Sequence, residues 1–154
     1  MDVDELFDGW ERAWSGRDPR AFEPVCLPDV HYEDPLTEPL EGRAGLIAHA
    51  LRLWEGAPDV RVQSMGARLQ DGRFACAPCK VLGTHTRSWG KLAAAGRPFE
   101  VHALVYAELR AGKLWRVRAL FDAYDAARQL GVLPRPGTAG ERALLMLRGF
   151  GLRG

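Results

Sequence analysis

The chain has 154 residues, of which 47% are apolar and 27% charged, and its formal net charge at pH 7 is +1. This length favours one domain with a sizeable core, and the balanced charge argues against nucleic acid as the main partner. No apolar run approaches the roughly 20 residues of a membrane-spanning helix, and the acidic start, Met-Asp-Val-Asp-Glu, is unlike a signal peptide. We therefore expect a cytoplasmic protein that binds neither nucleic acid nor a membrane.

The first part of the chain predicts helices followed by a short strand. Apolar residues recur at helical spacing over 2–15 and form one stripe, which predicts an amphipathic helix. Asp18-Pro19 is typical of an N-cap followed by proline at the first helical position, so a short second helix is expected there. Alternation over 29–34 then predicts a strand, which Pro35 ends.

The middle of the chain predicts one more helix and a pair of strands. Apolar spacing over 43–55 predicts the helix. An alternating stretch then leads into Asp71-Gly72, which is a good hairpin turn. The return strand is expected over 73–87, with an interruption near Pro78 because proline cannot donate a hydrogen bond to a neighbouring strand.

A second hairpin carries the most informative pattern. The stretch 99–109 can pair with 113–122 through a turn at 110–112. Alternation in the later strand predicts an apolar row made of Trp115, Val117, Ala119 and Phe121, and an opposite row made of Arg116, Arg118, Leu120 and Asp122. The charged row requires water, or a cavity in which the charges meet each other or a ligand. Arg116 and Arg118 are therefore candidate substrate-binding residues.

The order of the elements predicts the fold class. Residues 123–130 predict a short helix, and a last helix is expected over about 140–148. The whole order is typical of an α+β domain in which about three helices cover a strongly curved antiparallel or mixed sheet, a cone of the cystatin-like roll type. Such a cone encloses a pocket. We expect a single domain over 1–154, with 134–154 as a C-terminal helical extension.

The three cysteines indicate neither a disulfide framework nor a metal site. Cys76 and Cys79 have the spacing of a redox motif, but that motif needs a helix at its first cysteine and the flanks predict strand. A zinc site would need a second ligand pair at suitable spacing, and the sequence has none. We expect no metal and no organic cofactor.

Short motifs resemble the nuclear-transport-factor-2-like superfamily. The motifs shared with its SnoaL-like polyketide cyclases are Gly83-Thr84-His85-Thr86, Gly112-Lys113, and Asp122 followed by Gln129-Leu130-Gly131. The motifs shared with its ketosteroid isomerases are Glu33-Asp34-Pro35 and Arg118-Ala119-Leu120-Phe121. The resemblance covers roughly residues 3–133, and it implies the cone-shaped fold and a small hydrophobic substrate.

The resemblance also implies roles for individual residues. Asp34 lies where ketosteroid isomerases keep the aspartate that shuttles a proton, and Asp122 lies where the cyclases keep their acid/base aspartate. At isomerase spacing, Trp10 replaces the oxyanion-donating tyrosine but keeps an indole N–H, and Leu104 replaces the protonated aspartic acid. True ketosteroid isomerisation is not expected, because oxyanion stabilisation is usually the largest catalytic contribution.

Both aspartates also have a structural interpretation. Asp122 begins a helix, where aspartate is a favoured N-cap. Asp34 precedes Pro35, and its side chain could hold the following turn. The catalytic and structural interpretations stay open for both residues.

The histidines have two interpretations as well. His85 and His102 are expected on strands, where each could donate to a ligand carbonyl or relay a proton near pH 7. Each could also be a sheet histidine satisfied by a neighbour. His31 and His49 are assigned to the surface or to packing.

Aromatic residues from different elements should converge on one interior, and these are Trp10, Trp14, Tyr32 and Trp54. In a cone the core and the pocket share a lining, so these rings could bind a flat hydrophobic ligand. The apolar row of the last strand would need cover, which agrees with a homodimer through the outer sheet face.

These patterns favour a small-molecule cyclase or isomerase that moves protons next to a carbonyl of a polyketide- or steroid-like substrate. Asp122 is the expected main acid/base, and Asp34 is the second candidate. The alternative is a non-catalytic module that binds a hydrophobic ligand or assembles as a dimer. Epoxide hydrolysis ranks third, since it needs paired acids flanking an arginine and Ala119 occupies one of the acidic positions.

Overall fold

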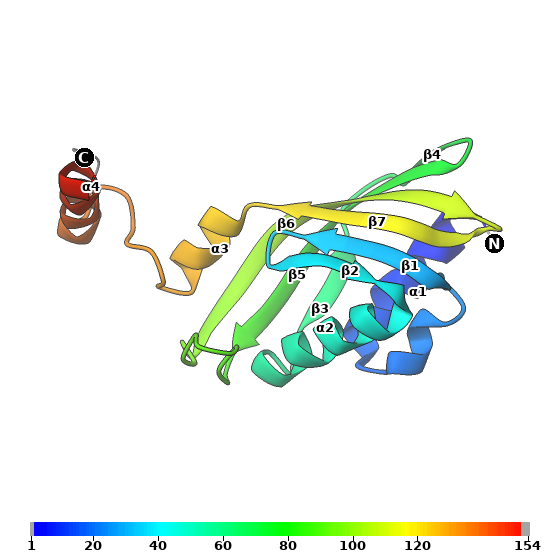
Figure 1. Ribbon diagram of the computed structural model, residues 1–154, viewed down its shortest axis with the longest axis horizontal. Helices are drawn as coiled ribbons and strands as arrows, with labels where there is room; N and C mark the ends of the chain where they lie inside the picture. Colours follow the sequence, from blue (N-terminus) through cyan, green and yellow to red (C-terminus); the bar gives the residue numbers. More distant parts are fainter. Residues whose placement is uncertain (1, 152–154) are drawn as a thin grey trace.

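The computed structural model describes residues 2–151 and is built on a curved seven-stranded sheet (Figure 1). The strands are β1 (Cys26–Asp34), β2 (Thr37–Glu41), β3 (Arg61–Ser64), β4 (Leu69–Asp71), β5 (Phe74–His85), β6 (Arg97–Arg110) and β7 (Lys113–Phe121). Their spatial order is β2-β1-β7-β6-β5-β3, and β4 pairs with the beginning of β5. Strands β1 and β7 run parallel and the other pairs antiparallel, so the predicted mixed sheet of an α+β fold is confirmed.

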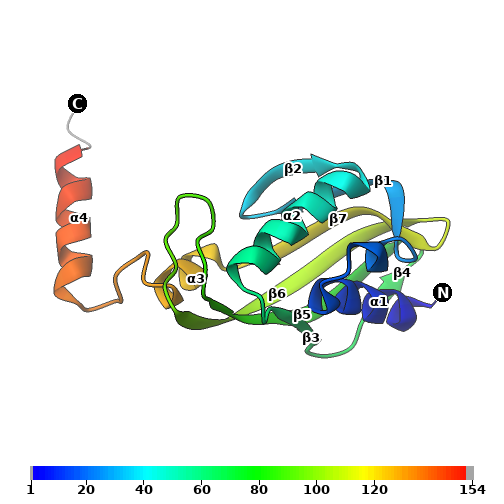
Figure 2. The ribbon, with the colours of Figure 1, turned by 90° about the horizontal axis from the view of Figure 1, so that it is seen from below.

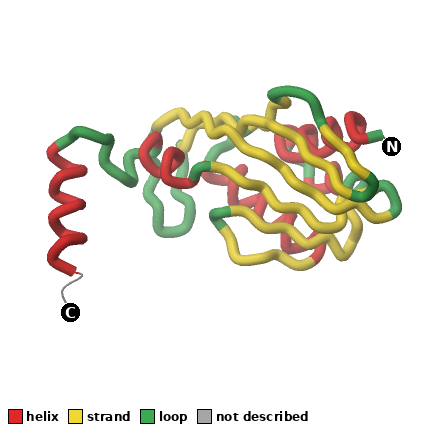
Figure 3. The backbone as a smooth tube through the Cα atoms, turned by 90° about the horizontal axis from the view of Figure 1, so that it is seen from above, coloured by secondary structure: helices red, strands yellow, loops and turns green. Residues whose placement is uncertain are grey.

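The helices of the described chain are α1 (Val3–Gly16), the 3-10 helix η1 (Pro19–Phe22), α2 (Gly42–Gly56), α3 (Ala123–Gln129) and α4 (Ala139–Gly151). Helices α1 and α2 lie across one face of the sheet, and α3 lies at its far end (Figure 2). Helix α4 stands away from the body (Figure 3) and falls in the predicted extension over 134–154, of which 152–154 lie outside the described residues. None of these helices is long and apolar enough to cross a membrane.

Helix α1 matches the helix predicted over 2–15, and local interactions define both of its ends. The side chain of Asp2 accepts a hydrogen bond from the backbone N–H of Glu5 at 2.8 Å, and the Glu5 carboxylate accepts one from the N–H of Asp2 at 3.2 Å. Arg17 adopts the left-handed conformation that ends the helix. The buried stripe consists of Leu6, Phe7, Gly9, Trp10, Ala13 and Trp14.

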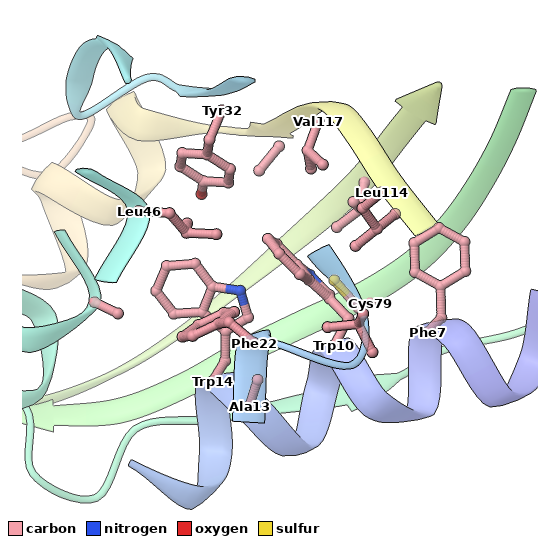
Figure 4. Close-up of a cluster of buried hydrophobic side chains, with 14 of the residues drawn as sticks. Phe7, Trp10, Ala13, Trp14, Phe22, Tyr32, Leu46, Cys79, Leu114 and Val117 are labelled. Atoms are coloured by element: carbon pink, nitrogen blue, oxygen red, sulfur yellow. The ribbon is translucent and has the colours of Figure 1, made fainter. Parts of the chain in front are cut away.

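A glycine brings α1 close to the start of β1. A Cβ atom at Gly9 would overlap with Cγ1 of Val25, so the approach requires a residue without a side chain. The approach holds the rings of Trp10 and Trp14 at 6.1 and 6.0 Å from the ring of Tyr32, centroid to centroid (Figure 4). The contact between Gly9 and the Val25 side chain thus lets an aromatic wall form between α1 and β1.

A β-bulge changes the faces of β7 within the predicted hairpin. The partner of β6 shifts from Leu114 to Arg116 between successive residues, so Trp115 is an extra residue. As a result Leu114 and Val117 are both buried, and Trp115 lies against the guanidinium group of Arg116, 4.3 Å from its ring centroid. The prediction that Trp115 shares a face with Val117 is wrong.

The apolar row of β7 beyond the bulge faces the concave side of the sheet. Val117 and Ala119 are buried, and Ala119 and Phe121 line a cavity under the helices. The chain's own helices cover this row, so it gives no reason to expect a partner there. The homodimer through the outer sheet face stays a prediction.

Strand β5 runs unbroken through Pro78, although an interruption was predicted there. Strand β4 pairs with β5 as far as Cys76, and β3 begins to pair at Cys79. Pro78 therefore lies in the gap between two partner strands, where its missing N–H costs no ladder hydrogen bond.

Candidate active site

A cavity of about 280 Å³ lies between the concave face of the sheet and helices α1, α2 and α3. Its walls are almost entirely apolar and consist mainly of valine, alanine, leucine and aromatic side chains. A carboxylate and an imidazole enter the lining at one place, where Tyr32, Asp34 and His49 meet. A hydrophobic ligand in this cavity would face one concentrated polar site.

Asp34 is the last residue of β1, and its side chain is only 4% exposed. Its Oδ1 accepts a hydrogen bond from the backbone N–H of Leu36 at 2.7 Å, which holds the turn after Pro35. Its Oδ2 accepts one from the hydroxyl of Tyr32 at 2.9 Å and lies 2.8 Å from Nε2 of His49. The predicted turn-holding role and a position in the cavity wall therefore belong to the same carboxylate.

The surroundings of Asp34 keep it charged. Burial raises the pKa of this carboxyl group, but the hydrogen bond and charge of His49, with the bonds from Leu36 and Tyr32, outweigh burial and leave the pKa below its ordinary value. Asp34 is therefore a carboxylate at neutral pH. In that form it accepts hydrogen bonds and orients its partners.

His49 comes from the middle of α2, and its side chain is 12% exposed. Because Nε2 faces the Asp34 carboxylate, the neutral imidazole carries its proton on Nε2 and keeps a lone pair on Nδ1. Nδ1 makes no hydrogen bond within residues 2–151, and the residue lines the cavity. This arrangement is typical of a general base that a carboxylate orients.

Tyr32 supports this pair and does not titrate near neutral pH. Burial, followed by the charge of Asp34, raises the pKa of its hydroxyl well above the ordinary value. The phenol stays protonated, and its proton is donated to Asp34.

Three of the four predicted aromatic residues line the cavity, namely Trp10, Trp14 and Tyr32. The indole N–H groups of Trp10 and Trp14 make no hydrogen bond within the part of the chain that the structure describes. Trp54 belongs to the core instead, where its N–H donates to the backbone carbonyl of Trp14 at 2.8 Å. Trp10 and Trp14 are therefore cavity-lining residues whose indole N–H groups are not used within the described chain.

His85 is fully buried at the end of β5, but it does not itself line the cavity. Its Nδ1 accepts a hydrogen bond from the N–H of Ala95 at 3.2 Å, and its ring stacks on Trp89 with centroids 4.4 Å apart. Burial lowers the pKa of His85, and the backbone of Arg87 opposes this shift. His85 is thus a neutral residue behind a ring that lines the cavity.

Asp122 lies outside the cavity. It follows β7, is exposed, and its Oδ1 accepts a hydrogen bond from the backbone N–H of Asp125 at 2.9 Å as the N-cap of α3. The expectation that this carboxylate faces the cavity is wrong, because residues of even number in this part of β7 face outward and Asp122 continues that side. The N-cap interpretation accounts for its position.

The charged row of β7 also lies on the outer face of the sheet. Arg118 pairs with Glu33, with Nε 2.9 Å from Oε2, and Arg116 lies 3.6 Å from Glu108. Both guanidinium groups are more than half exposed. Neither lines the cavity, so they do not bind a ligand there as expected.

His102 and Leu104 are further expected site residues that point outward from β6. The His102 side chain is 68% exposed, and Leu104 is 38% exposed. Their neighbours Val101, Ala103 and Val105 line the cavity, so alternation along the strand places these two residues on the opposite face.

Sequence reasoning missed His49 and Trp89 as residues of the site. For His49 a signal was present, because it falls at helical spacing among residues that pack inward, which are Leu46, Ala50 and Leu53. A histidine on the buried face of a helix needs a polar partner, and Asp34 is the nearby candidate. Nothing in the local pattern marks Trp89, because it lies in the loop between β5 and β6.

Comparison with known proteins adds a sequence match. The profile of the SnoaL-like polyketide cyclases matches residues 5–130, which contain the whole sheet, α2, α3, most of α1, and the Asp34–His49 pair. A search of curated proteins gave no match.

Solved structures share the fold. TsrD from Streptomyces laurentii superposes with a TM-score of 0.77 at 23% identity, over 86% of this chain and 99% of that chain. IdmH from Streptomyces antibioticus superposes with a TM-score of 0.74 at 21% identity, over 85% of this chain and 99% of that chain. A protein from Catenulispora acidiphila with a ketosteroid isomerase-like fold gives a TM-score of 0.73 at 18% identity, over 84% and 95% of the two chains.

Proposed function

The chain belongs to the SnoaL-like polyketide cyclase family, and on that premise we propose that it cyclises or isomerises its substrate by moving a proton next to a carbonyl group. The observation that carries the proposal is the contact between Asp34 and His49 at the wall of an otherwise apolar cavity. In this proposal His49 is the general base, and Asp34 is the positioning residue that fixes its tautomer. Trp10 donates its indole N–H to the carbonyl oxygen.

The proton moves along a short route. Nδ1 of His49 removes a proton from the carbon next to the carbonyl, and the electron pair of that C–H bond forms an enolate. The enolate oxygen accepts a hydrogen bond from Trp10, which offers the kind of stabilisation that an oxyanion hole provides. The imidazolium that results is stabilised by the Asp34 carboxylate 2.8 Å away.

Two outcomes then regenerate neutral His49. In an isomerisation, the imidazolium returns the proton to a different carbon of the same molecule. In a cyclisation, the enolate carbon attacks a second carbonyl group of the substrate, and the imidazolium protonates the new alkoxide. Both sequences balance without an external oxidant or reductant.

The substrate proposed from this cavity is a hydrophobic, polyketide- or steroid-like molecule with a ketone. Each Å² of apolar ligand surface that these aliphatic and aromatic walls remove from water contributes about 25 cal/mol to the free energy of binding. A single polar corner would orient such a molecule with its carbonyl group towards His49.

The sequence is also compatible with two other functions. A non-catalytic hydrophobic-ligand-binding module is the remaining alternative, and it would use the same cavity without proton transfer. Epoxide hydrolysis loses support because Asp34 is the one carboxylate, and no arginine is present, in the cavity lining that the structure describes.

Exchange of deuterium into a simple ketone tests the proposal without knowledge of the natural substrate. We suggest 2-tetralone in D₂O, with loss of its α-proton signals followed by NMR. The wild-type protein should accelerate exchange, and His49→Gln should reduce the acceleration by about 100-fold or more. His102→Gln is the matched control, because that histidine is exposed on the outer face. Binding of 2-naphthol with no exchange above the buffer rate would favour the non-catalytic module.

A further inference from the structure

The loop between β5 and β6 brings a ring to the end of the cavity. Residues 86–96 form a hairpin in which the backbones of Trp89 and Leu92 exchange two hydrogen bonds of 2.9 Å. Both residues line the cavity. Figure 2 shows this loop, in green, beside the C-terminal end of α2. The loop thus closes the cavity with side chains from outside the sheet and helices.

The base of the loop is tied to α2. The backbone carbonyl of Gly56 accepts hydrogen bonds from the N–H groups of Thr86 and Arg87 at 3.0 and 3.1 Å. The indole of Trp89 lies over the same glycine, and a Cβ atom at Gly56 would overlap with its Nε1 and neighbouring carbons. The missing side chain of Gly56 therefore creates the slot that the indole occupies.

Ring contacts complete the slot. His85 stacks on Trp89 with centroids 4.4 Å apart, and Phe99 packs edge-on at 5.9 Å. The indole N–H makes one long hydrogen bond, 3.4 Å, to the carbonyl of Leu53. Shape and packing, more than polar bonds, hold Trp89 in place.

Helix α2 connects this ring to the proposed base. Leu53 follows His49 by one helical turn and lines the cavity between His49 and the Trp89 slot. Gly56 lies seven residues after His49, which corresponds to about 10 Å along the helix axis. A ligand with its carbonyl group at His49 would extend along this wall until it meets Trp89.

We infer that Trp89 is a specificity-determining residue that limits the length of the fused-ring ligands this cavity accepts. The inference rests on the proposed function in one respect, since it takes the carbonyl or hydroxyl end of the ligand to lie at the Asp34–His49 pair. Without the indole, the cavity would extend to the ring of His85, which is buried directly behind it. Longer aromatic molecules with one polar end would then fit.

Two substitutions test the inference from opposite sides of the same contact. Trp89→Ala removes the indole, and Gly56→Ala adds a methyl group that expels the indole from its slot. Gly16→Ala is the matched control, because Gly16 also ends a helix and a Cβ atom there meets nothing within 4 Å. Dissociation constants for 2-naphthol and its three-ring analogue 2-anthrol would be measured by fluorescence titration.

The wild-type protein should bind 2-naphthol more tightly than 2-anthrol. Both Trp89→Ala and Gly56→Ala should shift the ratio of the two dissociation constants towards 2-anthrol by about tenfold or more, which is within the range that one pocket contact contributes, and Gly16→Ala should leave it unchanged. Gly56→Ala should also lower the melting temperature of the wild-type protein but not of Trp89→Ala, because the atoms that the methyl group meets are then absent.

An unchanged ratio in a folded Trp89→Ala or Gly56→Ala protein would overturn the inference. Equal affinity of the wild-type protein for both phenols, or affinity for neither, would overturn it as well. If Trp89→Ala does not fold, the ratio of the two dissociation constants is measured in Trp89→Phe and Gly56→Ala instead. Failure of the proposed function is distinguishable, because absence of ketone exchange leaves these binding ratios measurable.

Discussion

Nε2 of His49 lies 2.8 Å from Oδ2 of Asp34, although the two residues belong to different elements, α2 and β1. Both side chains are largely buried, so the contact is less screened than a surface ion pair. The carboxylate also accepts two other hydrogen bonds, which fix its orientation before any ligand binds. Preorganisation of this kind is what a positioned general base requires.

Asp34→Asn should reverse the tautomer of His49. The amide NH₂ group donates to Nε2, so the imidazole proton moves to Nδ1, and Nδ1 can no longer act as the base. Exchange of 2-tetralone should fall by about 10²- to 10⁴-fold, while the dissociation constant of 2-naphthol changes far less. A folded Asp34→Asn protein with the wild-type exchange rate would exclude Asp34 as a positioning residue.

Asp122→Asn should have little effect on activity. The amide oxygen can still accept the hydrogen bond from Asp125, so the loss of unfolding free energy should be about 1 kcal/mol or less. Exchange of 2-tetralone should equal that of the wild-type protein. A drop of 100-fold with intact binding would return Asp122 to the mechanism.

Periodicity in the sequence was sufficient to predict most of the fold. The apolar stripe of α1, the apolar spacing of α2 and the two hairpins are local patterns, and each appears in the structure close to its predicted bounds. The bulge at Trp115 could not be predicted, because it depends on how β7 pairs with β6 and not on its own alternation.

The site was harder to predict than the fold. Alternation tells which residues of a strand share a face but not which face is concave, so Arg116, Arg118 and Asp122 were assigned to the wrong side. Asp34 was identified as a candidate, whereas its partner His49 is 15 positions away and the contact depends on the packing of α2 over β1. The polar side chain of His49 on the buried stripe of α2 is the local signal that indicates a buried partner.

The stability of the protein should fall in acid partly because of Asp34. Its pKa is lower in the folded state than in the unfolded chain, where it lies near 3.9. The stabilisation is therefore fully present above that pH and is lost as pH falls through the folded-state pKa. The free energies of unfolding in urea should differ between the wild-type and Asp34→Asn proteins at about pH 5, and the difference should shrink as the pH falls below 4. A difference that grows in acid would contradict this assignment.

Trp10→Phe should weaken proton transfer more than binding. The substitution keeps an aromatic ring against Tyr32 but removes the indole N–H that we assign to the carbonyl oxygen. Loss of one such donor costs about 10²- to 10³-fold in turnover in other enzymes. Trp14→Phe is the comparison, because it removes a neighbouring indole from the same wall. Exchange of 2-tetralone should fall further in Trp10→Phe than in Trp14→Phe. Equal losses in the two variants would contradict the assignment of the carbonyl contact to Trp10.

The protonation of the His49 ring tests the central claim most directly, and it requires no substrate. A long-range ¹H–¹⁵N NMR spectrum of ¹⁵N-labelled protein distinguishes a neutral imidazole protonated on Nε2 from one protonated on Nδ1. His49→Gln assigns the signals, and the spectra are recorded through the titration of the ring. In the neutral form His49 should carry its proton on Nε2 in the wild-type protein and on Nδ1 in Asp34→Asn. A neutral His49 protonated on Nδ1 in the wild-type protein would contradict its role as a base held by Asp34.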